Sequence, residues 1–292
     1  MSWKGVVLAA GIGRRLAPLT RVVNKHLFLV YDKPMIYYPL TTLMLAGICD
    51  ITVVTTSEAA SQFIKLLGDG RQWGLSLTFQ VQDQPKGIAD GLLSIGGDNL
   101  RDRKIALILG DNIFFGAGLS NMLATAMSSN PGATVFGYDV ADPGAFGIVS
   151  LDADGRPFDI IEKPTTMGSR TAVTGLYFYQ PDVLDVLSRL SPSDRGELEI
   201  TDVNRCYLEQ QRLRVIKIGR GIAWLDGGTF EGLFEATQFV KIIQDRTGLR
   251  IACPEEIAYR RGFIDGAGLR RLINETPTAE YAAYLSRVLE DA

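Results

Sequence analysis

Histidine is almost absent from this sequence, which has one, His26, in 292 residues. A Ser–His–Asp triad could be built only around that residue, and a metal site with several histidine ligands is excluded. Cysteine is scarce too: Cys49, Cys206 and Cys253 lie far apart and form no metal-ligand pairs. We therefore expect reduced, buried thiols, and any metal ion must be bound by acidic side chains.

An excess of positive charge is also lacking, because the formal net charge is -3 with 22% charged residues. Binding a polyanion such as nucleic acid requires a basic surface, so we expect a small-molecule partner and no nucleic acid. The sequence has no charged-then-apolar leader and no apolar run long enough to cross a bilayer. These features predict a cytoplasmic protein with no membrane partner.

Linkers, low-complexity tracts and internal repeats are missing as well. With 46% hydrophobic residues, the chain can bury a substantial core. Helical periodicity dominates from Phe230 onward, whereas earlier residues alternate between strand-like and helix-like segments. We expect one domain over residues 1–292, with an α/β core at 1–229 and a helical C-terminal extension at 230–292.

What the chain does have is a glycine-rich loop directly after an apolar run. Val6-Val7-Leu8 predicts a first buried strand within residues 1–9, and Gly11, Gly13 and two arginines follow. Glycines leave backbone N–H groups accessible to an anion, and ligands of open α/β sheets bind beyond the carboxyl ends of the strands. Leu16 takes the place of the third glycine of a dinucleotide-binding turn, which favours a nucleoside triphosphate loop over a nicotinamide site. A turn without a ligand is the other alternative.

Predicted strands and helices alternate along the chain. Apolar runs predict strands at residues 51–56, 75–82, 104–109, 133–139, 174–179, 213–218 and 223–225, and a hairpin formed by 146–152 and 157–161. Helices are expected from Ser57, as the N-cap, to about Leu67, from Leu119 to about Ser129, and from Arg195 to about Gln211. This rhythm predicts an α/β fold with a Rossmann-like open, twisted, mixed sheet flanked by helices.

Two aspartates directly follow predicted strands. Asp111 comes after the strand at 104–109, and Asp226 comes after the strand at 223–225. Mg²⁺ prefers one or two carboxylates together with phosphate oxygens, so the pair would suit magnesium if the two side chains met. The sequence does not bring them together, and an acidic turn is the alternative for Asp111.

Further polar residues stand at predicted strand ends or near the loop. Lys25 is a candidate phosphate ligand, with a surface lysine on an apolar stem as the alternative. Gln82 carries an amide that both donates and accepts, which suits the edge of a pyrimidine base, but it could equally be a polar strand end. Glu162 could accept hydrogen bonds from sugar hydroxyls and Lys163 could neutralise a phosphate, unless the two form only a surface ion pair.

Seven blocks of the sequence, in order, resemble the sugar-phosphate nucleotidyltransferase family and, within it, most closely the thymidylyltransferases that act on glucose 1-phosphate. The blocks are Gly13-Arg14-Arg15-Leu16, residues 31–40, Gly110-Asp111-Asn112, Glu162-Lys163-Pro164, residues 173–179, residues 195–202 and residues 253–258. The likeness covers nearly the whole chain. It implies a fold of the nucleotide-diphospho-sugar transferase type and a homotetramer.

The resemblance also implies a role for individual residues. Arg15 and Lys25 would hold the triphosphate, Asp111 and Asp226 would hold the cofactor Mg²⁺, and these four would be the catalytic residues. The nucleotide would contact Leu8, Ala10, Gly11, Gly13, Arg15, Gln82, Gly87 and Asp111. The sugar phosphate would contact Gly147, Glu162, Lys163, Val173 and Arg195. The implied reaction transfers a nucleotidyl group, most closely from dTTP, to glucose 1-phosphate, giving dTDP-glucose and pyrophosphate for deoxysugar biosynthesis.

The chain departs from the family pattern on the nucleotide side. Ala10 stands where a glycine is usual, Ile12 where a serine is usual and Arg14 where a threonine is usual. His26 takes the place of a glutamine. These departures leave open a specialised relative that uses UTP or GTP, or a cyclitol or unusual sugar phosphate. From another class, a non-catalytic, nucleotide-sugar-binding regulatory paralogue would bind ligand without magnesium-dependent turnover.

Overall fold

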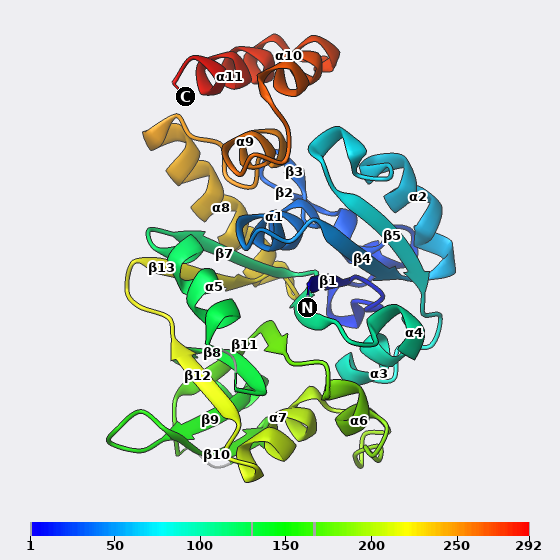
Figure 1. The fold of residues 1–292 in the computed structure, drawn as a ribbon, viewed down its shortest axis with the longest axis vertical. Coiled ribbons are helices and arrows are strands. Elements are labelled where there is room, and N and C mark those ends of the chain that lie inside the picture. The colour runs from blue at the N-terminus through cyan, green and yellow to red at the C-terminus, as the bar shows by residue number, and fades with distance from the viewer. Residues whose placement is uncertain (1, 130, 166–167, 292) are drawn as a thin grey trace.

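A mixed β-sheet forms the centre of the computed structural model, which describes residues 2–129, 131–165 and 168–291 (Figure 1). Met1 and Ala292, which belong to the expected domain, lie outside the described residues. The strands of the sheet are β1 (Trp3–Leu8), β4 (Asp50–Thr55), β5 (Ser76–Val81), β6 (Lys104–Leu109), β8 (Ala133–Asp139), β9 (Gly147–Leu151), β10 (Pro157–Glu162), β11 (Thr171–Tyr179) and β12 (Leu213–Lys217).

The order of these strands is β10-β9-β11-β6-β1-β4-β5, and β8 pairs with both β11 and β12. β1, β4, β5 and β6 run parallel, whereas β11 is antiparallel to β6. The carboxyl ends of β1 and β6 therefore meet at one edge of the sheet, where ligands bind in open α/β folds. The expected mixed α/β sheet is confirmed.

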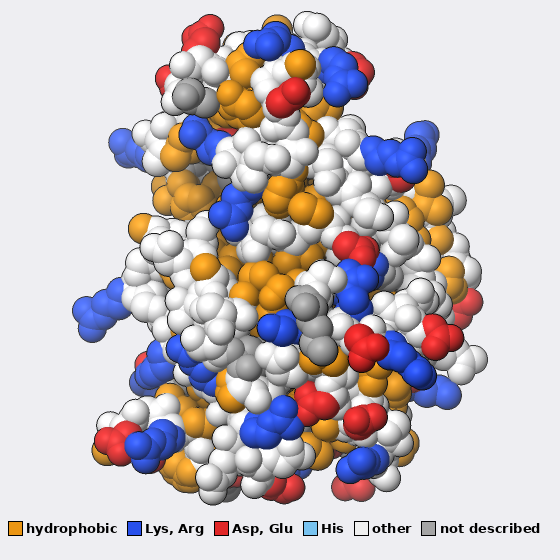
Figure 2. All heavy atoms as spheres, viewed as in Figure 1, with side chains coloured by type: hydrophobic (Ala, Val, Ile, Leu, Met, Phe, Trp, Pro, Cys, Tyr) orange, Lys and Arg blue, Asp and Glu red, His pale blue; other side chains and the backbone are white. Residues whose placement is uncertain are grey.

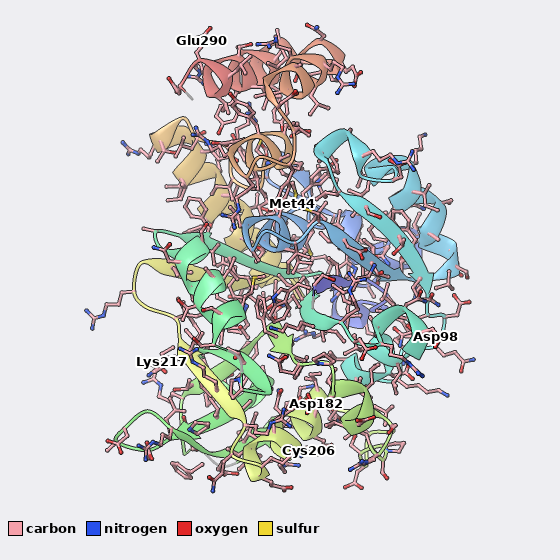
Figure 3. The ribbon with its side chains drawn as sticks, viewed as in Figure 1. Met44, Asp98, Asp182, Cys206, Lys217 and Glu290 are labelled. Atoms are coloured by element: carbon pink, nitrogen blue, oxygen red, sulfur yellow. The ribbon has the colours of Figure 1, made fainter. Side chains whose placement is uncertain are left out.

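Helices cover both faces of the sheet because the strand residues alternate between them. Val7 and Ile108 pack into a core with α1 (Tyr37–Leu45), α2 (Ser57–Leu67) and α5 (Leu119–Ser128). On the other face, Val6 and Leu107 pack with α3 (Ile88–Leu93), α6 (Val183–Leu187) and α7 (Ile200–Glu209). Figure 3 marks Met44 on α1 and Cys206 on α7, which belong to these two layers. A short helix, α4 (Gly97–Leu100), precedes β6.

A separate two-stranded ribbon joins segments that are distant in sequence. β7 (Asn112–Gly116) directly follows Asp111 and pairs antiparallel with β13 (Ile222–Asp226), with Asn112 opposite Asp226. The long helix α8 (Phe230–Thr247) packs on this ribbon, and Ala236 and Val240 contribute to its buried side. β2 (Leu29–Val30) and β3 (Lys33–Pro34) form another small ribbon. β7 lies outside the strands expected from the sequence, because its strand character depends on a partner far along the chain.

The last three helices lie together at one end of the molecule, opposite the β9–β10 hairpin (Figure 1). They are α9 (Pro254–Arg260), α10 (Gly266–Glu275) and α11 (Ala279–Glu290), and their small core includes Cys253, Leu269 and Leu285. Of the three free thiols, only that of Cys253 is fully buried, whereas Cys49 and Cys206 are half-buried. Within the described residues, no helix combines the length and apolar character needed to cross a bilayer. Figure 2 shows acidic and basic side chains interspersed over the face in view.

Two helix starts differ from the expected ones. The N-cap of α2 is Thr56, and the N–H of Ser57 is bound by the carboxylate of Asp83 at 2.8 Å, so a distant acid takes the capping role expected of Ser57. The helix expected to open at Arg195 begins at Ile200. Its preceding loop is held by the Glu199 carboxylate, which accepts hydrogen bonds from Ser193 and Arg195.

Candidate active site

Two adjoining cavities open at the carboxyl ends of β1 and β6. The larger cavity has a volume of about 420 Å³ and the smaller about 230 Å³, and Asp111, Glu162 and Lys163 line both. Of the other predicted site residues, the larger cavity is lined by Leu8, Ala10, Gly11, Gly13, Lys25, Gln82, Gly87 and Arg195. The smaller cavity is lined by Arg15, Gly147, Val173 and Asp226. The structure thus places all the predicted residues around one continuous site, and their roles stay predictions.

The glycine loop is fixed to the segment that carries Lys25. Asn24 donates its side-chain N–H to the Ala9 carbonyl at 3.0 Å, and its side-chain oxygen accepts from the backbone N–H of His26 at 2.9 Å. Lys25 therefore lies against the loop, and its Nζ would be 3.7 Å from a methyl group placed on Gly11. Asn24 is not among the residues predicted for the site, although its position directly before Lys25 is typical of a capping residue.

Lys25 reaches across the larger cavity to Asp111. The Lys25 Nζ lies 2.5 Å from Asp111 Oδ2, and each side chain is only 12% exposed. Burial alone would raise the pKa of Asp111, but the neighbouring charges, first of them Lys25, and the hydrogen bonds from Lys25 and Asn112 together hold that pKa below its ordinary range. Gly110 permits the close approach of the two strand ends, because a methyl group there would lie 2.7 Å from the Leu8 carbonyl oxygen. Asp111 is thus presented as a carboxylate.

Asp226 meets Asp111 because β13 pairs with β7. A methyl group placed on Gly228 would lie 2.9 Å from Asp226 Oδ1, 3.2 Å from Asp111 Oδ2 and 2.9 Å from Arg15 Nη2. Both carboxylates and one guanidinium therefore face the same small gap. Burial, followed by repulsion from Asp111, raises the pKa of Asp226. An added positive charge in this gap would relieve that repulsion.

The donor chemistry of this gap fits Mg²⁺ bound together with phosphate. No cluster of three or more His, Cys, Asp or Glu side chains suited to a metal occurs in the part of the chain that the structure describes. A cage made only of protein ligands is therefore not formed there. Two convergent carboxylates match the preference of Mg²⁺ for one or two carboxylates bound together with substrate phosphates.

Gln82 and Gly87 also line the larger cavity. Gln82 follows β5 and is 8% exposed, and its backbone N–H donates a hydrogen bond to the Thr55 carbonyl at 2.8 Å. Gly87 has φ of 109°, and a side chain there would collide with the Leu198 carbonyl, so only glycine fits. Without a side chain, Gly87 can expose only its backbone to the cavity that it lines.

The predicted sugar-side residues come from the β9–β10 hairpin and the residue that follows it, from β11, which carries Val173, and from the loop before α7. Gly147 and Glu162 are opposite each other in the hairpin. Glu162 Oε2 accepts a hydrogen bond from the Thr201 hydroxyl at 2.6 Å, which orients its carboxylate. Arg195 lies 3.5 Å from Glu162 and 2.8 Å from Glu199, and Lys163 lies 3.8 Å from Glu162. Two cations thus stand around one oriented acid, and Thr201 is a contributor not predicted from the sequence.

His26 is 2% exposed and, like its neighbour Lys25, lines the larger cavity. Burial, followed by the charge of Lys25, lowers its pKa from 6.5 to about 3. Below the ordinary histidine pKa of 6.5, the unfolded chain binds a proton on His26 that the folded protein does not bind. Stability is therefore lost as the pH falls from 6.5 toward about 3.

Replacing His26 by glutamine should remove this pH dependence, because the amide can still donate to Asn24, whose oxygen lies 2.8 Å from the His26 ring nitrogen. Between about pH 7 and about pH 5, we expect the wild-type protein to lose about 2 kcal/mol more unfolding free energy than His26→Gln. Urea unfolding of both proteins at the two pH values measures the difference. Identical losses would contradict the buried, neutral imidazole.

Comparison with known protein families and relatives gives consistent matches. A family model described as "Nucleotidyl transferase" matches residues 4–242. A glucose-1-phosphate thymidylyltransferase from Xanthomonas campestris is 50% identical over 283 residues, which cover 97% of this chain and 96% of the relative. The enzyme of the same name from Mycolicibacterium smegmatis is 47% identical over 287 residues, covering 98% of this chain and 99% of the relative.

Solved structures match the fold. A Bacillus anthracis protein described as a glucose-1-phosphate thymidylyltransferase, crystallised with sucrose, aligns with a TM-score of 0.74 and 37% identity, covering 82% of this chain and 95% of that one. The complex of UDP-glucose pyrophosphorylase with UDP-glucose aligns with a TM-score of 0.73 and 25% identity, covering 83% of this chain and 100% of that one.

Proposed function

Because the chain belongs to the nucleotidyl transferase family, we propose that it transfers a thymidylyl group from dTTP to glucose 1-phosphate, giving dTDP-glucose and pyrophosphate. The family predicted from the sequence blocks is confirmed by these matches. The observation that carries the proposed transfer chemistry is the convergence of Asp111, Asp226, Arg15 and Lys25 on the two adjoining cavities. The relatives that share this chain's full length carry the same activity in their names.

The proposed reaction needs no protein nucleophile. An oxygen of the sugar phosphate forms a bond to the α-phosphorus of the triphosphate, and the bond from that phosphorus to the bridging β-phosphate oxygen breaks, so pyrophosphate leaves. Catalysis of such an in-line transfer consists of positioning two anions and spreading their charge. Lys25 and Arg15 provide positive charge beside the glycine loop, and Lys163 and Arg195 provide it beside the hairpin.

Asp111 and Asp226 would hold the Mg²⁺, which when bound supplies positive charge to the triphosphate oxygens. Lys25 balances Asp111 when no triphosphate is present. Its Nζ lies beside Gly11, so the same ammonium can reach a phosphate that sits on the loop N–H groups. The Glu162 carboxylate, held by Thr201, would accept hydrogen bonds from sugar hydroxyls.

Release of pyrophosphate in the presence of Mg²⁺ tests the proposal. We expect turnover with dTTP and glucose 1-phosphate, and its loss when EDTA removes the metal and its return when Mg²⁺ is added back. Equal or better turnover with UTP, GTP or another sugar phosphate would instead favour a specialised relative. Binding of dTDP-glucose without any magnesium-dependent turnover would favour the non-catalytic paralogue.

We also propose a homotetramer. Phe230, Phe234 and Ile242 on α8 are 48%, 62% and 58% exposed, and apolar side chains at such spacing along one helix suit a subunit contact. Sedimentation velocity measures the assembly, and a monomer at micromolar concentration would contradict it.

A further inference from the structure

Asp90 holds the side chain of Gln82, the residue proposed to read the base. Asp90 lies in the first turn of α3, and its Oδ2 accepts a hydrogen bond from Gln82 Nε2 at 2.5 Å. The same carboxylate oxygen lies 3.4 Å from the backbone N–H of Lys86, at the start of the turn that presents Gly87 to the cavity. Asp90 does not line the cavity itself, so it can act on a base only through Gln82 and this turn.

The contact fixes which way the Gln82 amide points. A carboxylate has acceptor oxygens only, whereas an amide has one acceptor and one donor end. Turning the amide around would set Gln82 Oε1 against Asp90 Oδ2, two acceptors at hydrogen-bond distance. The carbonyl end instead occupies space beside Gly91, where a methyl group would lie 3.3 Å from Gln82 Oε1. The Asp90 carboxylate therefore favours one of the two orientations of the amide.

A fixed amide distinguishes between pyrimidines. Thymine and uracil present O4 as an acceptor beside N3–H as a donor, whereas cytosine presents an amino donor beside N3 as an acceptor. With one Nε2 hydrogen engaged by Asp90, Gln82 retains a second hydrogen and its Oε1, which match the thymine and uracil edge. A cytosine in the same pose would set donor against donor and acceptor against acceptor.

Building on the proposed function, we propose that Asp90 is a positioning residue for base selection, which holds Gln82 in the orientation that accepts thymine or uracil and rejects cytosine. The carboxylate must be an acceptor only for this role. An amide in place of this carboxylate, with one donor and one acceptor end, would allow Gln82 to adopt either orientation. A merely structural role at the helix start would affect all nucleotides alike.

The test compares kcat and KM for dTTP, dUTP and dCTP with glucose 1-phosphate in the wild-type protein and in Asp90→Asn. We expect the ratio of kcat/KM for dTTP to that for dCTP to fall about tenfold or more, mainly through KM for the nucleotide. The ratio for dTTP and dUTP should stay unchanged, because their base edges are the same. KM for glucose 1-phosphate should stay unchanged as well.

A double-mutant cycle tests whether Asp90 acts through Gln82. With Gln82→Ala in place, Asp90→Asn should produce no further change in the dTTP-to-dCTP ratio. An unchanged ratio in the single variant, with or without a general loss of activity or stability, would overturn the proposal. Calorimetry measures the affinities for dTTP and dCTP, and hence the selectivity between them, without any turnover. If the wild-type protein were inactive, that would count against the proposed reaction, and the affinity ratio would still test the role of Asp90.

Discussion

Replacing Asp111 by asparagine is expected to lower kcat for pyrophosphate release by about a thousandfold, or about 4 kcal/mol in activation free energy. Asp111 lines both cavities and shares a gap with Asp226 and Arg15, so its charge acts where the two substrates would meet. The fold should persist, because Lys25 also acts on Asp226 and keeps a counter-charge when Asp111 is neutral. Pyrophosphate release under saturating substrates measures the loss.

Asp98→Asn provides the matched control for this prediction. It makes the same chemical change on α4, where the side chain is fully exposed and lines neither cavity (Figure 3). We expect wild-type turnover from it. A wild-type rate in Asp111→Asn, with the melting temperature preserved, would remove Asp111 from the proposed chemistry and with it the two-carboxylate site.

Local sequence patterns predicted most of the sheet and its helices. The apolar runs at 104–109 and 133–139 became β6 and β8 with the same bounds, and the segment from Phe230 to Thr247 became α8. The apolar periodicity that determines these elements lies within each segment itself, so it is visible in the sequence. The starts of α2 and α7 differ from expectation. At α2, the distant Asp83 carboxylate binds the Ser57 N–H, and before α7 the Glu199 carboxylate binds the Ser193 hydroxyl in the preceding loop.

The meeting of Asp111 and Asp226 is a different kind of result. It depends on the register in which β7 pairs with β13, and two short strands far apart in sequence give no local signal of that pairing. The same limit applies to the contact between Asp90 and Gln82, since each residue by itself is typical of a helix start or a strand end. The order of the motifs in the sequence identified the residues of the site, but only the tertiary structure shows which of these residues contact one another.

Asn112 joins these parts. It is 2% exposed, and its Oδ1 accepts hydrogen bonds from the Gly175 N–H at 2.9 Å and from Trp224 Nε1 at 2.6 Å. Its Nδ2 donates to Asp111 Oδ1 at 3.1 Å. One amide thus links β11, the β7–β13 ribbon and the carboxylate that faces both cavities.

Replacing Asn112 by aspartate keeps both acceptor bonds but puts a second carboxylate against Asp111. We expect a loss of about 3 kcal/mol in unfolding free energy at neutral pH and at least about a tenfold loss in kcat, because two buried like charges lie at hydrogen-bond distance. The new carboxyl should have a raised pKa, since burial and Asp111 both disfavour its charge. The folded state then binds more protons than the unfolded state, so the deficit should shrink as pH falls.

Asn112→Leu separates the effect of charge from the effect of lost hydrogen bonds. It has a similar shape but leaves the Gly175 and Trp224 N–H groups without their acceptor, a cost that does not depend on pH. Urea unfolding at neutral and mildly acidic pH measures the loss of unfolding free energy relative to wild type. This loss should become smaller at acidic pH in Asn112→Asp but not in Asn112→Leu. Parallel pH profiles for the two variants would mean that Asn112 serves only as a bridge between strands. A shrinking deficit in Asn112→Asp alone would mean that the Asn112 amide also keeps a further negative charge away from Asp111.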